Sequence, residues 1–279
     1  MMTRRNVLKS SAALAAMAAM PSILSAQAEP RLRIGSCSLD LVRAKAAGLD
    51  GVEVGVGGAA DTLQIADPTH RAKLKEQMKE TGLSISSFMM GLFNSYPLAS
   101  DPRGPAWLEQ SIDAAQDLGA KVILVAFFGK GSLEQGKKLK TADVDVVVER
   151  IKKAAPRAKD KGIILGIENT VSAQQNVEIM ERINNDAVKI YYDVYNLTGM
   201  GYDVPAEIRS LKEKIAIFHF KNGAQYLGEG KLQFDPIRDA IDDIGYKGWI
   251  VLETSSPSKD AVADAKKNAE FIRKLFKMA

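Results

Sequence analysis

Residues 163–168 read Ile-Ile-Leu-Gly-Ile-Glu, a short and almost wholly apolar run that ends in one carboxylate. The pattern recurs in Lys189–Asp193, in Ile215–Phe220 with its His219, and in Trp249–Glu253. Short continuous apolar runs are typical of strands that are buried on both faces, as in a parallel sheet. The second half of the chain therefore predicts four buried strands, each with one polar side chain at or near its carboxyl end.

The first half of the chain continues the pattern, and helical segments separate the runs. Four further strands are expected at Leu32–Ser36, Gly51–Val54, Ser84–Phe88 and Val122–Phe127. Pairs such as Lys161-Gly162 and Thr81-Gly82 precede several strands, and glycine there is typical of a helix end. Eight strand–helix units in about 250 residues predict a single (β/α)8 TIM barrel.

An open, doubly wound α/β sheet is the competing fold. The segment Gly55–Ala60 follows a predicted strand and imitates a dinucleotide-binding fingerprint. However, Asp67-Pro68 interrupts the chain soon afterwards, so no long helix is expected to open on these glycines. A loop over the barrel mouth is the favoured interpretation.

The first 28 residues predict an export signal. They carry basic residues near the start, an apolar stretch from Ala12 to Leu24, an Ala26-Gln27-Ala28 cleavage pattern and no acid. The segment from Arg4 to Lys9 resembles a twin-arginine signal. The alternative is a membrane-anchoring helix, but this apolar stretch is too short to span about 30 Å of hydrocarbon. We expect cleavage after Ala28, export by the twin-arginine machinery to the periplasm or beyond, no stable membrane anchor, and one catalytic domain over residues 29–279.

Composition excludes several classes of protein. The chain has 279 residues, of which 46% are hydrophobic and 26% charged, which is ordinary globular composition. Its single cysteine, Cys37, excludes a disulfide framework, and its two histidines exclude a three-histidine zinc site. Without the predicted signal the chain carries 35 basic and 34 acidic residues, so no charge excess points to a nucleic-acid partner. The oligomeric state stays open, a homo-oligomer included.

Four polar residues mark the carboxyl ends of the last four predicted strands: Glu168, Asp193, His219 and Glu253. In a barrel these ends converge on one mouth, where barrel enzymes carry out their chemistry. Three buried carboxylates repel one another unless a positive charge compensates them. Their oxygens and one imidazole suit Mn²⁺ or Mg²⁺ best, with Co²⁺ or Zn²⁺ as alternatives. We therefore expect one divalent metal ion at this mouth.

Several motifs give the chain a family resemblance over most of residues 31–275. It resembles the xylose-isomerase-like TIM barrels, the superfamily of sugar phosphate isomerases and epimerases. The motifs are Gly166–Asn169, Tyr192–Asn196, His219–Asn222, Leu227–Gly230 and Gly245–Glu253. In ketose epimerases of this family, the positions that match the four strand-end residues bind one divalent metal. The resemblance also implies that the two matching glutamates, Glu168 and Glu253, form the acid–base pair.

The positions expected to bind substrate are Asn196, Lys221, Glu53, Gln225 and Glu229. Asn196 stands where many family members have His, and Gln225 where sugar epimerases often have Arg, so the substrate stays open. Lys221 either contacts a substrate oxygen or lies solvated at the rim. Glu229 is more typical of a loop organiser, and Glu53 ends the second predicted strand and is expected to reach the pocket.

The predicted function is that of a metal-dependent sugar isomerase or epimerase. Proton abstraction next to a carbonyl would give a metal-stabilised enediolate, and two carboxylates would remove and return the proton. The alternatives are a lyase or dehydratase acting on 3-keto sugars or glycosides, and a non-catalytic sugar-binding barrel. A DNA-repair nuclease is disfavoured because its His-rich metal positions and basic surface are missing. The expected partner is a small sugar or keto-sugar substrate.

Overall fold

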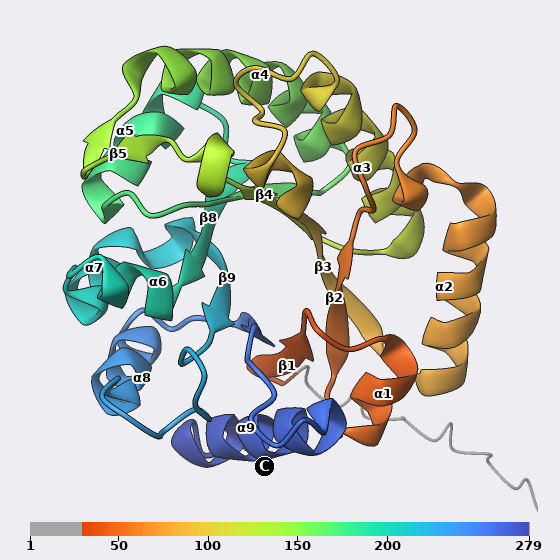
Figure 1. Ribbon diagram of the computed structural model, residues 1–279, viewed down its shortest axis with the longest axis vertical. Coiled ribbons are helices and arrows are strands. Elements are labelled where there is room, and N and C mark those ends of the chain that lie inside the picture. The colour runs from red at the N-terminus through yellow and green to blue at the C-terminus, as the bar shows by residue number, and fades with distance from the viewer. Residues whose placement is uncertain (1–29, 279) are drawn as a thin grey trace, which may run out of the picture. The chain divides into compact units, whose positions relative to one another are not determined.

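A computed structural model describes residues 30–278, in which eight parallel strands close into a barrel with the helices around it (Figure 1). The barrel strands are β1 Leu32–Ser36, β2 Gly51–Gly55, β3 Ser84–Met90, β4 Val122–Ala126, β7 Ile164–Glu168, β8 Val188–Asp193, β9 Ile215–Phe220 and β10 Gly248–Leu252. They pair in the order β1-β10-β9-β8-β7-β4-β3-β2. The predicted TIM barrel is thus confirmed, and every predicted strand is present with its ends displaced by at most two residues.

Closure of the sheet excludes the open doubly wound fold. Five residues of β1 pair in register with β10, from Leu32 opposite Gly248 to Ser36 opposite Leu252. The glycine-rich segment after β2 is a loop, and no helix opens on it. Arg103 and Trp107 donate hydrogen bonds to backbone carbonyls of this loop, at 2.8 and 2.7 Å. The dinucleotide-binding interpretation therefore lacks the helix that it requires.

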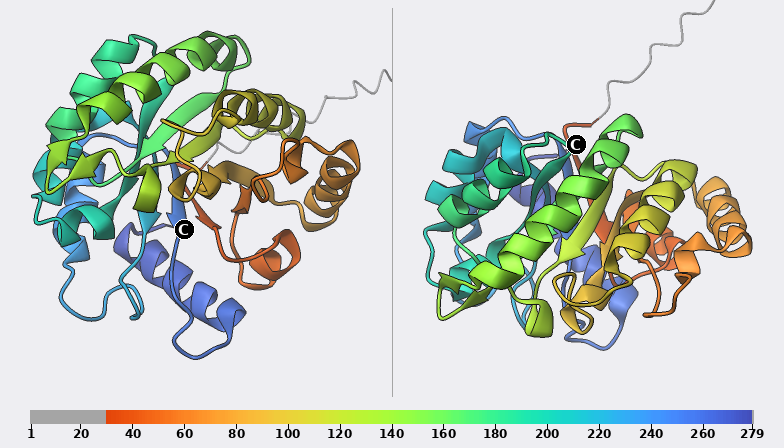
Figure 2. Two further views of the ribbon diagram at one scale, coloured as in Figure 1. Left: turned by 45° about the horizontal axis from the view of Figure 1, so that its top comes forward. Right: turned by 90° about the horizontal axis from the view of Figure 1, so that it is seen from above.

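The helices surround the barrel, as two further views show (Figure 2). They are α1 Leu41–Ala46, α2 Pro68–Thr81, α3 Gly104–Leu118, α4 Thr141–Asp160, α5 Ala173–Ile183, α6 Val194–Gly199, α7 Val204–Leu211, α8 Phe234–Asp243 and α9 Ala261–Leu275. Local sequence explains their ends: Asp67 caps α2 ahead of Pro68, and Gly82 ends it in the left-handed conformation. No helix in the described part of the chain is long and apolar enough to cross a membrane.

Two features of the connections were not predicted. A hairpin of β5 Glu134–Gln135 and β6 Lys138–Leu139 lies between β4 and α4, with positive φ at both turn residues. Two short helices, α6 and α7, join β8 to β9 where one helix was expected.

The barrel interior determines where the strand-end residues lie. An inner apolar cluster includes Tyr191 on β8, Ile217 on β9 and Val251 on β10. Alternate residues of a strand face the same side, so the next inward positions are Asp193 on β8, His219 on β9 and Glu253 directly after β10. The fold therefore places three of the four predicted metal ligands in one layer of side chains. This layer lies above the apolar interior, at the carboxyl ends of the strands.

Candidate metal centre and substrate cavity

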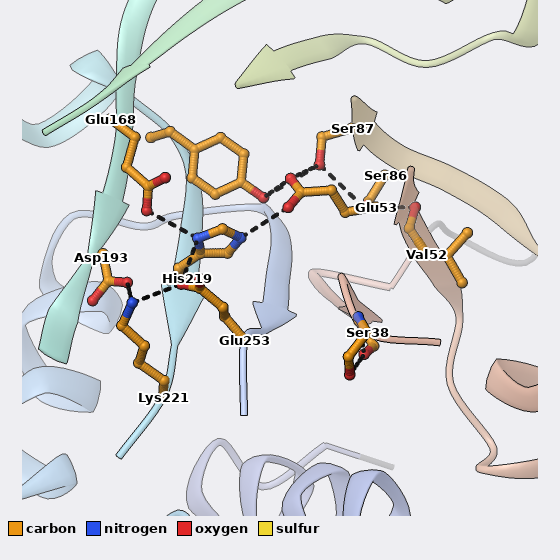
Figure 3. A network of polar contacts seen from close by, with 12 residues as sticks. Ser38, Val52, Glu53, Ser86, Ser87, Glu168, Asp193, His219, Lys221 and Glu253 are labelled. Atoms are coloured by element: carbon orange, nitrogen blue, oxygen red, sulfur yellow. Dashed lines mark hydrogen bonds and ion pairs between the residues drawn. The ribbon is translucent and has the colours of Figure 1, made fainter. Parts of the chain in front are cut away.

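The four strand-end residues come together at the barrel mouth (Figure 3). One ligand atom from each of Glu168, Asp193, His219 and Glu253 lies within 4.8 Å of all the others. His219 Nδ1 lies 2.9 Å from Glu168 Oε1 and 3.3 Å from Glu253 Oε2. Three of the side chains are buried, whereas that of Glu253 is 35% exposed. The cluster is therefore closed below and open on the side of Glu253.

Asp193 has one oxygen that is engaged and one that is not. Its Oδ1 caps α6 by accepting the backbone N–H groups of Tyr195 at 2.8 Å and Asn196 at 2.7 Å. Its buried Oδ2 accepts no hydrogen bond of good geometry, although Lys221 Nζ lies 2.9 Å away. Lys221 Nζ also lies 2.8 Å from Glu253 Oε2. The ammonium group of Lys221 thus bridges the Asp193 and Glu253 carboxylates of the cluster.

Burial and neighbouring charges shift the acid–base properties of the cluster. Burial raises the pKa of Glu168 to about 7. Burial also opposes ionisation of Glu253, but His219 and Lys221 outweigh it and lower the pKa of that carboxyl. Burial alone would lower the pKa of His219, yet Glu168 and Glu53 raise it well above its usual range. These shifts arise because the carboxyls, the imidazole and the ammonium group are packed together in a largely buried site.

The residues present fit a divalent metal ion. The donor set is three carboxylates and one imidazole, which suits Mn²⁺ or Mg²⁺ and accommodates Co²⁺ or Zn²⁺. The buried Asp193 Oδ2 is paired with Lys221 Nζ at 2.9 Å but accepts no hydrogen bond of good geometry, so this oxygen is available to a metal ion. A divalent ion here would also lower the pKa of the surrounding carboxyls, Glu168 included.

Glu53 lies beneath the imidazole and not on the cavity. Its side chain is fully buried, and its Oε1 lies 3.1 Å from His219 Nε2. Its Oε2 accepts hydrogen bonds from Tyr191 at 2.7 Å and Ser87 at 2.6 Å. Neither Tyr191 nor Ser87 was singled out from the sequence. Tyr191 stands two residues before Asp193 on the same strand, so strand alternation was the signal that could have found it.

A cavity of about 270 Å³ opens directly on the cluster. Its lining residues are Met89, Gly91, Asn94, Leu124, Ala126, Phe128, Glu168, Asn196, Lys221 and Glu253. The lining therefore combines apolar side chains with two carboxylates, two amides and one ammonium group. Of the five predicted substrate residues, Asn196 and Lys221 lie on this cavity.

The other two predicted substrate residues lie elsewhere. Gln225 lines a separate cavity of about 800 Å³, together with residues of α6, α7 and α8. Glu229 is half exposed and lies 3.2 Å from Lys267 Nζ, while its backbone carbonyl accepts a hydrogen bond from Asn222 at 2.6 Å. Asn222 Nδ2 also donates to Tyr226 O at 2.8 Å. Glu229 thus belongs to the organisation of the loop after β9.

Comparisons with known proteins agree with this fold. L-ribulose-5-phosphate 3-epimerase from Escherichia coli strain SE11 is 25% identical over 267 residues, covering 88% of this chain and 92% of its own. A solved L-ribulose 3-epimerase superposes with a TM-score of 0.73 at 23% identity, over 88% of this chain and 95% of its own. D-allulose 3-epimerase from Methylomonas sp., solved with D-allulose, superposes with a TM-score of 0.71 at 19% identity. The match covers 88% of this chain and 98% of the epimerase chain. These proteins are sugar epimerases, which are isomerases.

Two family models match the chain. Residues 1–21 match the signal sequence of the twin-arginine translocation pathway, as predicted, although they lie outside the described residues. The second match, to the xylose isomerase-like TIM barrel model, covers residues 41–275, which include seven of the eight barrel strands. The chain belongs to the xylose isomerase-like TIM barrel family.

Proposed function

We propose that this protein is an exported, divalent-metal-dependent sugar epimerase or isomerase that moves a proton on a carbon next to a carbonyl. The observation that carries the proposal is the placement of Glu168 and Glu253. Both line the same small cavity, and both approach His219 Nδ1, although they come from strands that two others separate. A substrate carbon in this cavity would have a carboxylate on each of two sides.

The metal ion would be held by Glu168, Asp193, His219 and Glu253. When bound, it supplies Lewis-acid polarisation of a substrate carbonyl. Lys221, which already faces the cavity, offers a second positive charge to a substrate oxygen. Asn196 offers an amide that can donate to or accept from a hydroxyl group.

Two carboxylates make epimerisation the favoured reaction. One carboxylate removes a proton from one face of the substrate carbon, and the other returns a proton to the opposite face. Return to the adjacent carbon would give aldose–ketose isomerisation instead. The curated relative and the solved neighbours are named as 3-epimerases, which supports epimerisation over elimination.

We further propose that the substrate carries no phosphate. Among the described residues that line the cavity, Lys221 is the one cation, and its ammonium group is already paired with Asp193 and Glu253. Recognition of a phosphate dianion normally uses arginine forks, lysines or clustered N–H groups. The apolar lining residues Leu124, Ala126 and Phe128 instead suit the C–H groups of a neutral sugar.

Hydrogen–deuterium exchange into a sugar panel tests the proposal. The Mn²⁺-loaded protein is incubated in D₂O with free ketoses, 3-keto sugars and ketose 5-phosphates, and carbon-bound deuterium is measured by NMR. We expect exchange next to the carbonyl of a free sugar and little with its phosphate. A Glu168→Gln, Glu253→Gln double variant is the control.

The outcomes separate the alternatives. Elimination product from the wild type would indicate a lyase. Sugar binding without exchange would indicate a non-catalytic barrel. Faster exchange with the phosphate than with the free sugar would overturn the substrate proposal while leaving the reaction intact.

A further inference from the structure

We propose that Glu53 is the residue that positions His219 for the metal, by holding the proton on Nε2 and leaving Nδ1 free as the ligand atom. This inference rests on the proposed function, because it assumes that the cluster binds a metal. It assigns a positioning role to a fifth residue, a buried carboxylate that two hydrogen bonds hold in place behind the four predicted ligands.

The two ring nitrogens of His219 face opposite sides. Nδ1 points to the cluster, 2.9 Å from Glu168 Oε1 and 3.3 Å from Glu253 Oε2. Nε2 points away from it, 3.1 Å from Glu53 Oε1 (Figure 3). A neutral imidazole donates from one nitrogen and offers a lone pair on the other. Oε2 of Glu53 already accepts from two hydroxyl groups, and Oε1 is the oxygen that faces Nε2, so the contact that this geometry supports is an Nε2–H group donating to Oε1.

Glu53 is itself fixed by two hydroxyl groups. Its Oε2 accepts hydrogen bonds from Tyr191 on β8 and from Ser87 on the neighbouring strand β3, which stands opposite Glu53 in the sheet register. The Tyr191 ring also packs against the His219 ring, with centroids 4.5 Å apart. All of these side chains are buried. The imidazole therefore has one orientation, set by the barrel interior.

This arrangement has two chemical consequences for the metal. The carboxylate fixes the ring plane, so that Nδ1 is directed at the cluster before any ion arrives. Its negative charge also raises the basicity of the ligating nitrogen. Loss of such a partner typically costs about 10–100-fold in metal affinity.

Variants of the network test the inference by metal affinity. Glu53→Gln keeps the volume but removes the charge, and Tyr191→Phe removes one of the hydroxyl groups that hold it. Calorimetric titration of the chelator-treated full-length protein with Mn²⁺ should show about 10–100-fold weaker binding for Glu53→Gln and a smaller loss for Tyr191→Phe. Circular dichroism and a thermal melt establish that each variant is folded.

Tyr192→Phe is the matched control. Tyr192 is the next residue on β8, but its hydroxyl donates to Glu207 Oε2 on α7 at 2.9 Å, outside the barrel interior. The variant also loses one tyrosine–carboxylate hydrogen bond. Its Mn²⁺ affinity should equal that of the wild type. Weaker Mn²⁺ binding by Tyr192→Phe as well would indicate that a general loss of stability, and not the Glu53 network, weakens the binding.

A spectroscopic test needs no variant. The chain has two histidines, so ¹⁵N imidazole spectra resolve His219 with His70 as an internal reference. On addition of the diamagnetic ion Zn²⁺, Nδ1 of His219 should shift while Nε2 keeps its proton.

Zn²⁺ bound at Nε2, or a folded Glu53→Gln variant with wild-type Mn²⁺ affinity, would overturn the role of Glu53 and leave the metal site standing. A wild-type protein that binds neither ion would overturn both this inference and the proposed function.

Discussion

Glu168 and Glu253 are the residues on which the proposed chemistry depends. Glu168 is the last residue of β7 and is buried, whereas Glu253 follows β10 and is partly open to the cavity. Their pKa values are pushed apart, upward for Glu168 and downward for Glu253. Pairs of this kind often divide acid and base roles between them, although acids around one metal titrate as a set.

Replacing either glutamate with glutamine should remove most turnover. Glutamine keeps the volume and a carbonyl oxygen but cannot shuttle a proton. Glu168→Gln and Glu253→Gln should each lower kcat by about 10²–10⁴-fold, measured on a substrate that the wild type converts.

Glu229→Gln provides the control for this experiment, because Glu229 is half exposed and paired with Lys267 away from the cavity. It should keep wild-type turnover. Near-wild-type rates in both active-site variants would remove the two-glutamate mechanism.

At the scale of elements, one helix residue ties together two loops of the barrel mouth. Asp264 on α9 accepts hydrogen bonds from Tyr226, in the loop after β9, and from Ser256 and Ser258, in the loop that follows Glu253. Burial opposes its ionisation, but these hydrogen bonds hold the pKa of Asp264 at about 2. The loop beyond Glu253 is therefore anchored through a carboxylate.

Asp264→Asn should destabilise the barrel at neutral pH. The asparagine side chain would turn an N–H group towards the hydroxyl groups that donate hydrogen bonds to the Asp264 carboxylate. Loss of these hydrogen bonds should lower the free energy of unfolding by about 1–3 kcal/mol. Because the pKa of Asp264 is lower in the folded than in the unfolded protein, its ionised form stabilises the fold fully at pH values above the unfolded pKa of about 4. This stabilisation is lost as the pH falls towards the folded-state pKa of about 2. The difference between wild type and variant in urea unfolding should shrink over that range.

Asp239→Asn is the comparison for this element. Asp239 is an exposed acid on α8 that pairs with Arg238, and such surface pairs contribute little. If both variants unfolded at the same urea concentration, the anchoring role of Asp264 would be wrong.

At the scale of the whole molecule, the four residues of the proposed metal site come together only when the barrel is closed. His219 and Glu253 lie late in the chain, Glu53 lies early, and β1 pairs with β10 to join the two ends of the sheet. Metal binding to such a site is coupled to folding. If the cluster binds a metal as proposed, we expect the protein to fold and take up the ion before it leaves the cytoplasm.

Arg4→Lys combined with Arg5→Lys should keep the protein in the cytoplasm, because the matched signal belongs to a pathway that carries folded proteins. Cell fractionation in a host with that pathway measures the effect. A variant with only Lys9→Ala should still be exported. Unchanged export of the double variant would indicate another route.

The sequence alone determined the order of strands and helices, the barrel and the four polar residues that converge at its mouth. These follow from simple rules: apolar runs indicate buried strands, glycines mark helix ends, and eight strand–helix units in about 250 residues predict a barrel. Glu168, Asp193, His219 and Glu253 could be found because each stands at the end of such a run.

Only the tertiary structure decided which other residues reach the site. Glu53 was expected on the pocket and lies under His219, while Gln225 and Glu229 lie away from the cavity. Tyr191, which supports Glu53, comes from 138 positions further along the chain. Such contacts depend on the register between strands and on the course of the loops, which bring together residues that no local pattern connects.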